Sequence, residues 1–431
     1  MQLIISNPYF PPYSTGGAEH SLEQLCLNLS NEGVRIDIVT PSFDIKDQRE
    51  DINENFRVNR FGTDVIIQAG QDSNIENYFF SREYHNKTVK SIRSLSQKKT
   101  ILIANNAQCI LPVAEASNKL SLPSIAIVRD AQYFCMPGSC IQSRKPVNTV
   151  VCKGFTGQFF CYLKSLQRNG AINRRAYPGI AFDSALLQIR RIKLRKRGLQ
   201  SMDKIVAISE GIKNIFSANN VLHEKTRISV IHNFHTAIDP VDPTAVAYFL
   251  KENSLDNCPY FLVAGKKSYG KGSDLAFDAI QKLNSRLEFN AAKILFVGKG
   301  GGKYNSKHSV DHESISQALL MGVLRKAVAL IVPGRCQEGL HRSMVDAVFY
   351  KKPIICTEAG GVATGVVNDM NGYIVPCEDS NSLAEAMEKI LSWDKEQYNQ
   401  CASTSKKIFN QKFSSSVLQD KWTTLLGNCL K

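Results

Sequence analysis

Two acidic residues eight positions apart, Glu338 and Asp346, could grip the hydroxyl groups of a sugar-containing ligand. Glu338 follows an apolar run at 328–332 and a Pro-Gly pair that breaks it, so we expect it at the entrance of a helix. Eight helical residues would separate the two acids by about 12 Å, which roughly spans a nucleotide-sugar. One carboxylate could hold the sugar and the other a ribose, while backbone N–H groups between them receive a diphosphate.

The elements that position these acids are a helix and two strands. Four apolar residues after Glu338 recur at helical spacing: Leu340, Met344, Val345 and Val348. Lys351 and Lys352 suit the negative end of that helix, and a strand at 354–357 follows Pro353. The simpler interpretation is that Glu338 only caps the helix and that Asp346 is a solvated polar position. Spacing alone leaves both interpretations open.

A glycine pair near the start of the chain, Gly16 and Gly17, lies between an expected strand at 2–6 and an expected helix. Gly33 ends this helix, and residues 34–40 form a second strand, which gives the βαβ unit of a parallel sheet. Glycines at a helix N-terminus let a phosphate approach the backbone closely. An ordinary tight turn is the alternative.

The rest of the chain continues the alternation of strands and helices that is typical of the α/β class. Further strands are expected at 56–61, 100–104, 124–129, 204–207, 227–231, 260–264 and 292–297. Helices are expected at 75–95, 111–120, 273–283, 382–391 and 414–430. Arg129 and Asp130 end a strand, where the catalytic groups of open α/β sheets collect.

Length and composition indicate a two-domain globular protein. The chain has 431 residues, of which 43% are hydrophobic, and two domains of about 200 residues would each hold a full core. No run of eighteen apolar residues and no basic leader is present, so we expect a cytoplasmic protein. A P-loop lysine motif, an HExxH pair and an Asp-x-Asp pair are also absent from the sequence, which argues against ATPase, zinc-peptidase and metal-dependent GT-A transferase chemistry.

Two local compositions stand out. Four of the twelve cysteines, Cys135, Cys140, Cys152 and Cys161, crowd one region; they could bind zinc, although they lack a CxxC pair and loop packing is the simpler account. The net charge of +14 is concentrated at 161–200, where ten Lys or Arg residues face a single acid. Anionic lipid, a phosphorylated acceptor or nucleic acid could bind there, or the residues form a solvated helix face. The lack of interleaved aromatic residues argues against nucleic acid.

The segment at 330–376 resembles the nucleotide-sugar site of the retaining family 4 glycosyltransferases, within the glycosyl transferases group 1. The residues that carry the resemblance are Glu338, Asp346, Ala347, Lys352, Pro353, Ile354, Ile355, Gly360, Gly361, Asn371 and Gly372. The resemblance implies the GT-B fold, with two Rossmann-like doubly wound parallel-sheet domains facing a central cleft. Residues 1–236 would bind the acceptor and residues 237–411 the donor, and a final helix at about 412–431 would pack back on the first domain.

The resemblance also implies catalytic roles. Glu338 would hold hydroxyl groups of the donor sugar, while Lys266 and Lys271 would neutralise its diphosphate in place of a metal. Arg129 stands where many relatives carry a histidine; arginine cannot act as a base but can bind an anionic leaving group or acceptor. Donor contacts are implied for Gly16, Gly17, Gly265, Gly298, Gly339, Leu340, His341 and Asp346. No cofactor and no metal is implied.

The implied reaction moves a sugar from a UDP- or GDP-sugar to a hydroxyl of a carbohydrate or lipid-linked acceptor, with retention, in polysaccharide, lipopolysaccharide or glycolipid synthesis. Three positions depart from the family pattern. Asp346 is shorter than the usual glutamate, His341 replaces a glycine, and Thr364 stands where a second acid often occurs. They mark an altered donor pocket or a catalytically degenerate scaffold that binds a membrane or a partner. Under either interpretation, residues Arg190 to Arg197 are the predicted contact with an anionic membrane surface at the inner face.

Overall fold

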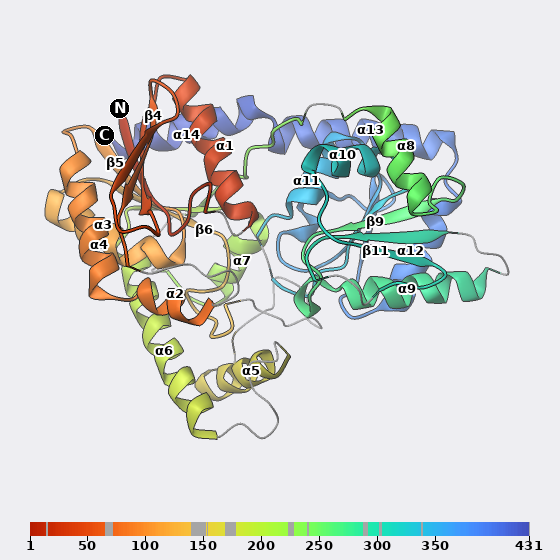
Figure 1. The fold of residues 1–431 in the computed structure, drawn as a ribbon, viewed down its shortest axis with the longest axis horizontal. Helices are drawn as coiled ribbons and strands as arrows, with labels where there is room; N and C mark the ends of the chain where they lie inside the picture. The colour runs from red at the N-terminus through yellow and green to blue at the C-terminus, as the bar shows by residue number, and fades with distance from the viewer. Residues whose placement is uncertain are drawn as a thin grey trace. The chain divides into compact units, whose positions relative to one another are not determined.

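The computed structural model describes residues 1–13, 16–64, 72–138, 152, 154–168, 178–222, 228–238, 241–287, 292–300, 304–337 and 339–430. They form two compact units (Figure 1). The first contains the described residues within Met1–Gly138, Val151–Phe234 and Ser415–Lys431, and the second those within His235–Ser414. The chain therefore passes from one unit to the other after Phe234, and the C-terminal helix α14 (Ser415–Cys429) belongs to the first unit.

The first unit is built on an eight-stranded sheet in the order β3-β4-β2-β1-β5-β6-β7-β8. Its strands are β1 (Gln2–Ser6), β2 (Arg35–Pro41), β3 (Gln48–Asp51), β4 (Phe56–Phe61), β5 (Thr100–Ala104), β6 (Ser124–Val128), β7 (Lys204–Ala207) and β8 (Ile228–Val230). All pairings are parallel except that of β3 with β4. The sequence did not predict β3, because its four residues are exposed and polar and so give no hydrophobic pattern.

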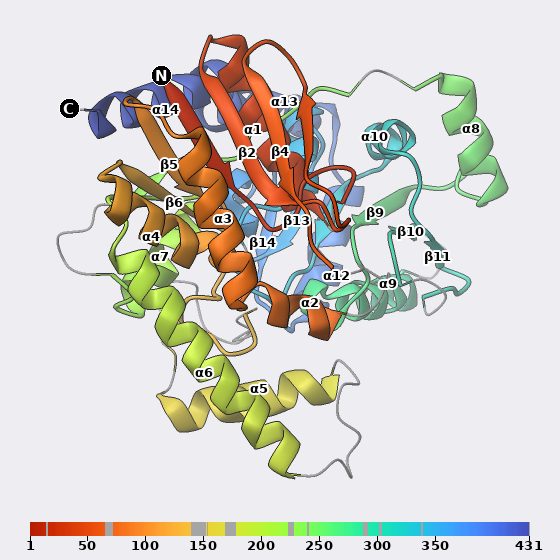
Figure 2. The ribbon, with the colours of Figure 1, turned by 60° about the vertical axis from the view of Figure 1, so that its left-hand side comes forward.

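Helices cover both faces of this sheet (Figure 2). The helices of the first unit are α1 (Gly17–Asn31), α2 (Asp72–Tyr78), α3 (Arg82–Leu95), α4 (Ile110–Leu120), α5 (Phe155–Arg168), α6 (Pro178–Gln200) and α7 (Glu210–Ala218), together with α14. The single helix expected at 75–95 is two helices, because the Ser81 hydroxyl accepts the Tyr84 N–H at 3.1 Å and caps a new one. Helix α5 packs on the first half of α6, away from the sheet (Figures 1 and 2).

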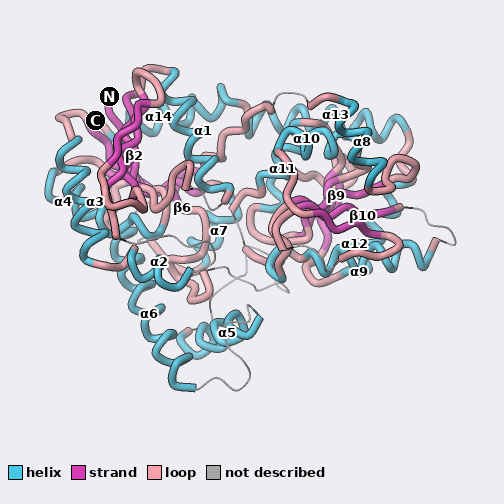
Figure 3. Tube along the Cα trace, in the orientation of Figure 1, coloured by secondary structure: helices cyan, strands magenta, loops and turns pink. Residues whose placement is uncertain are grey.

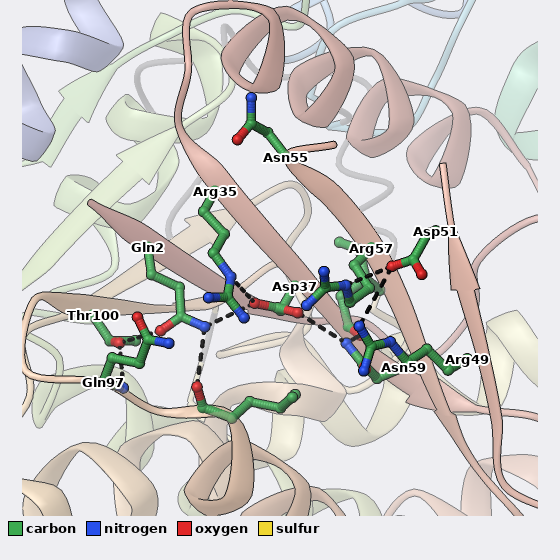
Figure 4. A network of polar contacts seen from close by, with 12 residues as sticks. Gln2, Arg35, Asp37, Arg49, Asp51, Asn55, Arg57, Asn59, Gln97 and Thr100 are labelled. Atoms are coloured by element: carbon green, nitrogen blue, oxygen red, sulfur yellow. Dashed lines mark hydrogen bonds and ion pairs between the residues drawn. The ribbon is translucent and has the colours of Figure 1, made fainter. Parts of the chain in front are cut away.

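A buried carboxylate fixes the amino ends of the central strands in the first unit (Figure 4). Asp37 is fully buried, and its Oδ2 accepts a hydrogen bond from Gln2 Nε2 at 2.7 Å and lies 3.4 Å from Arg35 Nε. Asn59 Nδ2 donates to Asp37 Oδ1 at 3.3 Å, and the Thr100 hydroxyl donates to Gln2 Oε1 at 2.6 Å. These contacts join β1, β2, β4 and β5, so this polar network stabilises the amino edge of the sheet, opposite the carboxyl edge at which open α/β sheets generally bind ligands.

The second unit has a six-stranded parallel sheet in the order β11-β10-β9-β12-β13-β14. Figure 3 draws its strands, β9 and β10 among them, in magenta. Its strands are β9 (Tyr260–Ala264), β10 (Lys293–Val297), β11 (Ser309–His312), β12 (Leu330–Val332), β13 (Ile354–Thr357) and β14 (Gly372–Val375). Its helices are α8 (Pro243–Glu252), α9 (Ser273–Arg286), α10 (Gln317–Lys326), α11 (Arg342–Phe349), α12 (Ser380–Leu391) and α13 (Lys395–Ile408). Both sheets thus confirm the predicted α/β architecture of two parallel-sheet domains, with one antiparallel edge strand in the first.

Alternate residues of the second sheet enter two separate cores. Leu262 and Leu295 pack with helices α8, α10 and α11, whereas Phe261 and Phe296 pack with α9 and α12. Because successive side chains of a strand point to opposite faces, this alternation buries both faces of the sheet. Among the described residues, no helix of either unit is long and apolar enough to cross a membrane.

Candidate functional site

Two glycines meet at the carboxyl edge of the second sheet. Gly265 follows β9 with φ +133°, and Gly298 follows β10 with φ +150°. The Gly265 N–H donates to the Val297 carbonyl at 2.9 Å, and a Cβ added to Gly298 would lie 2.0 Å from the Gly265 carbonyl oxygen. The fold therefore requires glycine here, and the two predicted donor-binding turns lie side by side with bare backbone.

The two lysines beside this turn, Lys266 and Lys267, differ in burial and in contacts. Lys267 is buried, and its ammonium pairs with the buried carboxylate of Asp311 and donates to the His312 carbonyl at 2.8 Å. Lys266 is exposed. Sequence reasoning chose Lys266 as the charge for a diphosphate, and the structure leaves this side chain at the surface while its neighbour is used to hold β11.

Lys271 lies near His341, on the turn Tyr269–Lys271 that leads into α9. Its Nζ is 3.2 Å from Nε2 of His341, the residue that caps α11. An ammonium can only donate, so Nε2 accepts and Nδ1 carries the ring proton toward the Ser343 hydroxyl at 3.1 Å. Burial and then the charge of Lys271 lower the pKa of His341 well below its ordinary value, so the ring is neutral.

Arg335, which sequence reasoning missed, fixes the loop that carries Lys271. Its guanidinium is nearly fully buried and forms a forked pair with Asp274 at 2.6 and 2.9 Å. It also lies 2.9 Å from Glu378, stacks 4.2 Å from the centre of the Tyr269 ring and donates to the Tyr269 carbonyl at 2.8 Å. These partners lie far away in the sequence, so no local motif could have identified this contact.

The start of α11 differs from the sequence prediction. The helix begins at Arg342, so the prediction that eight helical residues separate Glu338 from Asp346 is wrong. Only the four residue steps from Arg342 to Asp346, a rise of about 6 Å, are helical. Glu338 itself lies outside the described residues. Gly339 is buried and Leu340 is partly buried in the loop before the cap. The loop takes the place of the first turn because His341 holds extended backbone angles, φ −79° and ψ 119°.

Gln337 links this loop to the predicted Gly360-Gly361 turn. Its side chain is buried, and its Oε1 accepts the Gly360 N–H at 2.7 Å. Thr357 donates its hydroxyl to the Gly334 carbonyl, which ties the same two loops a second time. Sequence analysis assigned no role to either side chain, because a lone Gln or Thr belongs to no recognisable motif.

The side chain of Asp346, the second predicted acid, is buried inside the second unit. Its Oδ1 is 3.1 Å from Nε2 of His235, and the two side chains are only 4% and 5% exposed. The His235 ring packs on Phe349, with ring centres 4.4 Å apart, and on Phe409 at 5.5 Å. Contact with a ribose stays a prediction for Asp346, and its observed partner is the first residue of the second unit.

The candidate residues of the first unit lie at the carboxyl ends of β1 and β6. Gly16 and Gly17 are exposed at the start of α1, where the Gly16 N–H donates to Glu19 Oε2 at 2.8 Å. Arg129 donates to the Asn105 side-chain oxygen at 2.8 Å and to that of Asn233 at 3.0 Å. Burial lowers the pKa of Arg129 to about 10, and the charge of Glu19 acts in the opposite direction. Arg129 thus stays a cation at neutral pH.

The basic segment on α6 is not one uniform surface. Arg191 and Arg195 are buried, and Arg191 donates to Asn77 at 2.6 Å while Arg195 lies 3.6 Å from Glu76. Both guanidinium groups stack on the ring of Phe80. These two charges therefore hold the helix to the first unit and do not face a partner.

Metal ligands are not gathered in the described part of the chain. Among those residues, no group of three or more His, Cys, Asp or Glu side chains could hold a metal ion. Of the predicted cysteine cluster, Cys135 is buried and Cys161 is exposed, and Cys140 lies outside the described residues.

Known proteins resemble this chain in sequence and in fold. Residues 258–392 match the family model described as Glycosyl transferases group 1. The O-antigen chain mannosyltransferase C of Escherichia coli is 25% identical over 253 residues, which cover 55% of this chain and 64% of that protein. The alignment thus spans less than two thirds of this curated relative.

Two solved structures share the architecture across nearly the whole chain. HepE of Anabaena, in complex with UDP-glucose, has a TM-score of 0.61 at 13% identity and covers 99% of this chain and 100% of its own. Sucrose-phosphate synthase of Thermosynechococcus elongatus has a TM-score of 0.65 at 15% identity, with 99% and 98% covered. At such identities the likeness shows the fold alone. The chain therefore has the GT-B fold, and its residues 258–392 are similar to the glycosyl transferases group 1.

Proposed function

We propose that this protein is a retaining glycosyltransferase of the family 4 type, which transfers a sugar from a UDP- or GDP-sugar to a hydroxyl of a carbohydrate or lipid-linked acceptor. The family match supports transfer of a sugar. The UDP-glucose bound to HepE and the mannosyltransferase relative support a nucleotide-sugar donor and a polysaccharide-type product.

The observation that carries this proposal is the group of residues at the carboxyl edge of the second sheet. Gly265 is exposed there beside the buried Gly298, and Lys271 lies against the cap of α11. The N-terminus of a helix attracts anions, and a nearby ammonium adds a full positive charge. Lys266 supplies a second exposed cation beside the glycine turn. This combination suits a diphosphate and needs no metal ion.

In the proposed reaction the bond between the anomeric carbon and the diphosphate breaks while the acceptor oxygen bonds to the same face of that carbon. The acceptor proton passes to the departing phosphate oxygen, so no enzyme nucleophile is needed. Lys271 and Lys266 stabilise the negative charge that develops on the diphosphate. Glu338 would hold the sugar hydroxyls, and Arg129 would bind an anionic leaving group or acceptor.

Isothermal titration with UDP, GDP and ADP tests the donor class. We expect one of UDP and GDP to bind at micromolar strength, and Lys271→Ala to weaken it at least tenfold, about 1.4 kcal/mol. Lys251→Ala is the matched control, because Lys251 is exposed on α8 of the same unit and has no proposed role. Retention is then checked by NMR of the anomeric proton in the product. Absence of binding by all three nucleotides would instead support the degenerate scaffold.

A further inference from the structure

Helix α6 has two opposite basic faces, and only one of them is used by the fold. Arg191 and Arg195 lie four residues apart and are buried. A second series recurs every three or four residues and is exposed throughout: Phe182, Leu186, Arg190, Lys193 and Arg197. Residues with this spacing form one stripe along a helix. The stripe changes along its length, from apolar at the start of α6 to basic toward its end.

Helix α5 extends the apolar end of this stripe. Phe160 of α5 is 58% exposed and Phe182 of α6 is 48% exposed, and both rings contact Phe159, with ring centres 6.2 and 6.4 Å apart. Leu186 and Leu187 are 46% and 43% exposed nearby on α6. Beneath them, Tyr162 and Ala185 are buried between the two helices and with Met136. The apolar group is therefore held on a packed helix pair.

We propose that this α5–α6 surface binds an anionic lipid bilayer, with Phe160, Phe182 and Leu186 entering the interface and the basic stripe of α6 contacting headgroups. An interfacial protein surface needs apolar side chains that insert and cations beside them. The exposed lysine Lys164 adds a charge on α5, and Asp183 is the only acid on α6. A second copy of the chain would bring like charges together, so an anionic surface fits better. The proposal does not depend on the nucleotide site.

Vesicle sedimentation tests whether the basic stripe of α6 contacts anionic headgroups. The full chain is mixed with vesicles of phosphatidylcholine alone or with about 30% phosphatidylglycerol, at about 50 and 300 mM salt. We expect binding only with phosphatidylglycerol, and weaker binding at high salt because the charges are screened. The triple variant R190Q/K193Q/R197Q should bind at least tenfold more weakly. The control K395Q/K406Q/K407Q removes the same charge from exposed positions on α13 and should bind like wild type.

Tryptophan emission tests the apolar half. The chain's two tryptophans, Trp393 and Trp422, are both buried, so a Phe160→Trp variant adds an exposed reporter. We expect its emission to shift to the blue on anionic vesicles and to be quenched by brominated lipid tails. F160S/F182S should weaken vesicle binding, whereas the matched exposed pair Y248S/V367S should not, and thermal melts confirm that each variant is folded.

Three outcomes would overturn the proposal. These are equal binding to neutral and anionic vesicles, equal loss in the α13 control, and unshifted emission of the Phe160→Trp variant with vesicles bound. Sedimentation equilibrium without lipid adds a fourth: self-association that F160S/F182S abolishes would assign the surface to a second copy instead.

Discussion

The predicted glycine turns of the two units differ in how far the fold requires them. In the second unit, any side chain at Gly298 would strike the Gly265 carbonyl, and both residues hold positive φ angles. In the first unit, Gly16 has extended backbone that any residue adopts, and a Cβ on Gly17 would meet no described atom within 4 Å. Packing therefore explains the glycines of the second unit, whereas a side chain in place of Gly17 in the first unit would enter open space.

This difference separates packing from binding. A glycine that the fold requires is explained without a ligand, whereas open space at the start of α1 is explained if a bound group needs that space. Asp346 is likewise explained without a ligand, because its carboxylate already has a buried partner in His235. Substitutions at these residues should thus split into losses of stability in the second unit and losses of binding in the first.

The largest expected effect is that of Gly298→Ala. The added methyl would lie 2.0 Å from a backbone oxygen at φ +150°, so the free energy of unfolding should fall by about 3 kcal/mol or more. Urea unfolding of a Trp422→Phe background, followed by the fluorescence of Trp393, reports the second unit. Gly334→Ala is the control, since its nearest neighbour is 3.8 Å away. Equal stability of Gly298→Ala and Gly334→Ala would show that the fold does not require glycine at position 298.

Asp346→Ala should have the next largest effect. Removing the carboxylate leaves the buried His235 without its hydrogen bond, so we expect a loss of about 2 kcal/mol in the free energy of unfolding. His235→Ala should lose a similar amount, and the double variant should lose less than the sum, because the two residues act as a pair. Titration of the same variants with the bound nucleotide decides the ribose role. A tenfold loss of affinity at Asp346→Ala alone, with His235→Ala unaffected, would show that Asp346 also contacts the ligand.

Sequence reasoning succeeded where the signal is local. Continuous apolar runs predicted the buried parallel strands, such as β9, and glycine turns after strands predicted which loops lie at the carboxyl edge. The diphosphate role of Lys271, which the family resemblance implies, stays a prediction; the structure places this side chain beside His341.

What the sequence could not predict depends on contacts between distant residues. Arg335 acts through Asp274 and Glu378, and His235 acts through a residue 111 positions away. The inward turn of Arg191 and Arg195 is set by Glu76 and Asn77 on another helix, so a count of charges on α6 could not separate the two faces. Strand β3 is polar and gains its place only by pairing with β4.

A smaller effect is expected from His341 in acid. Because burial and Lys271 lower its pKa in the folded chain, the unfolded chain binds a proton there at higher pH than the folded chain does. Stability from this residue is complete above about pH 6.5 and is lost as the pH falls below it. Between about pH 7.5 and 5.5, wild type should lose about 1 kcal/mol more than His341→Gln, measured by urea unfolding. An equal loss in both would show that the ring is not held neutral against Lys271.

Gly17→Ala should change stability least. It is the most direct test of whether the open space at the start of α1 receives a ligand. Its Cβ would meet no described atom, and alanine favours the start of α1, so the free energy of unfolding should change by less than about 1 kcal/mol. If the open space receives the donor phosphates, the added methyl should still lower kcat/KM for sugar transfer about tenfold. Gly427→Ala, in an equally open position on α14, is the matched control: it should change the free energy of unfolding by a similarly small amount, less than about 1 kcal/mol, and leave kcat/KM unchanged. Full activity in Gly17→Ala would show that the glycine pair is an ordinary turn, and the contrast between the two units would then rest on packing alone.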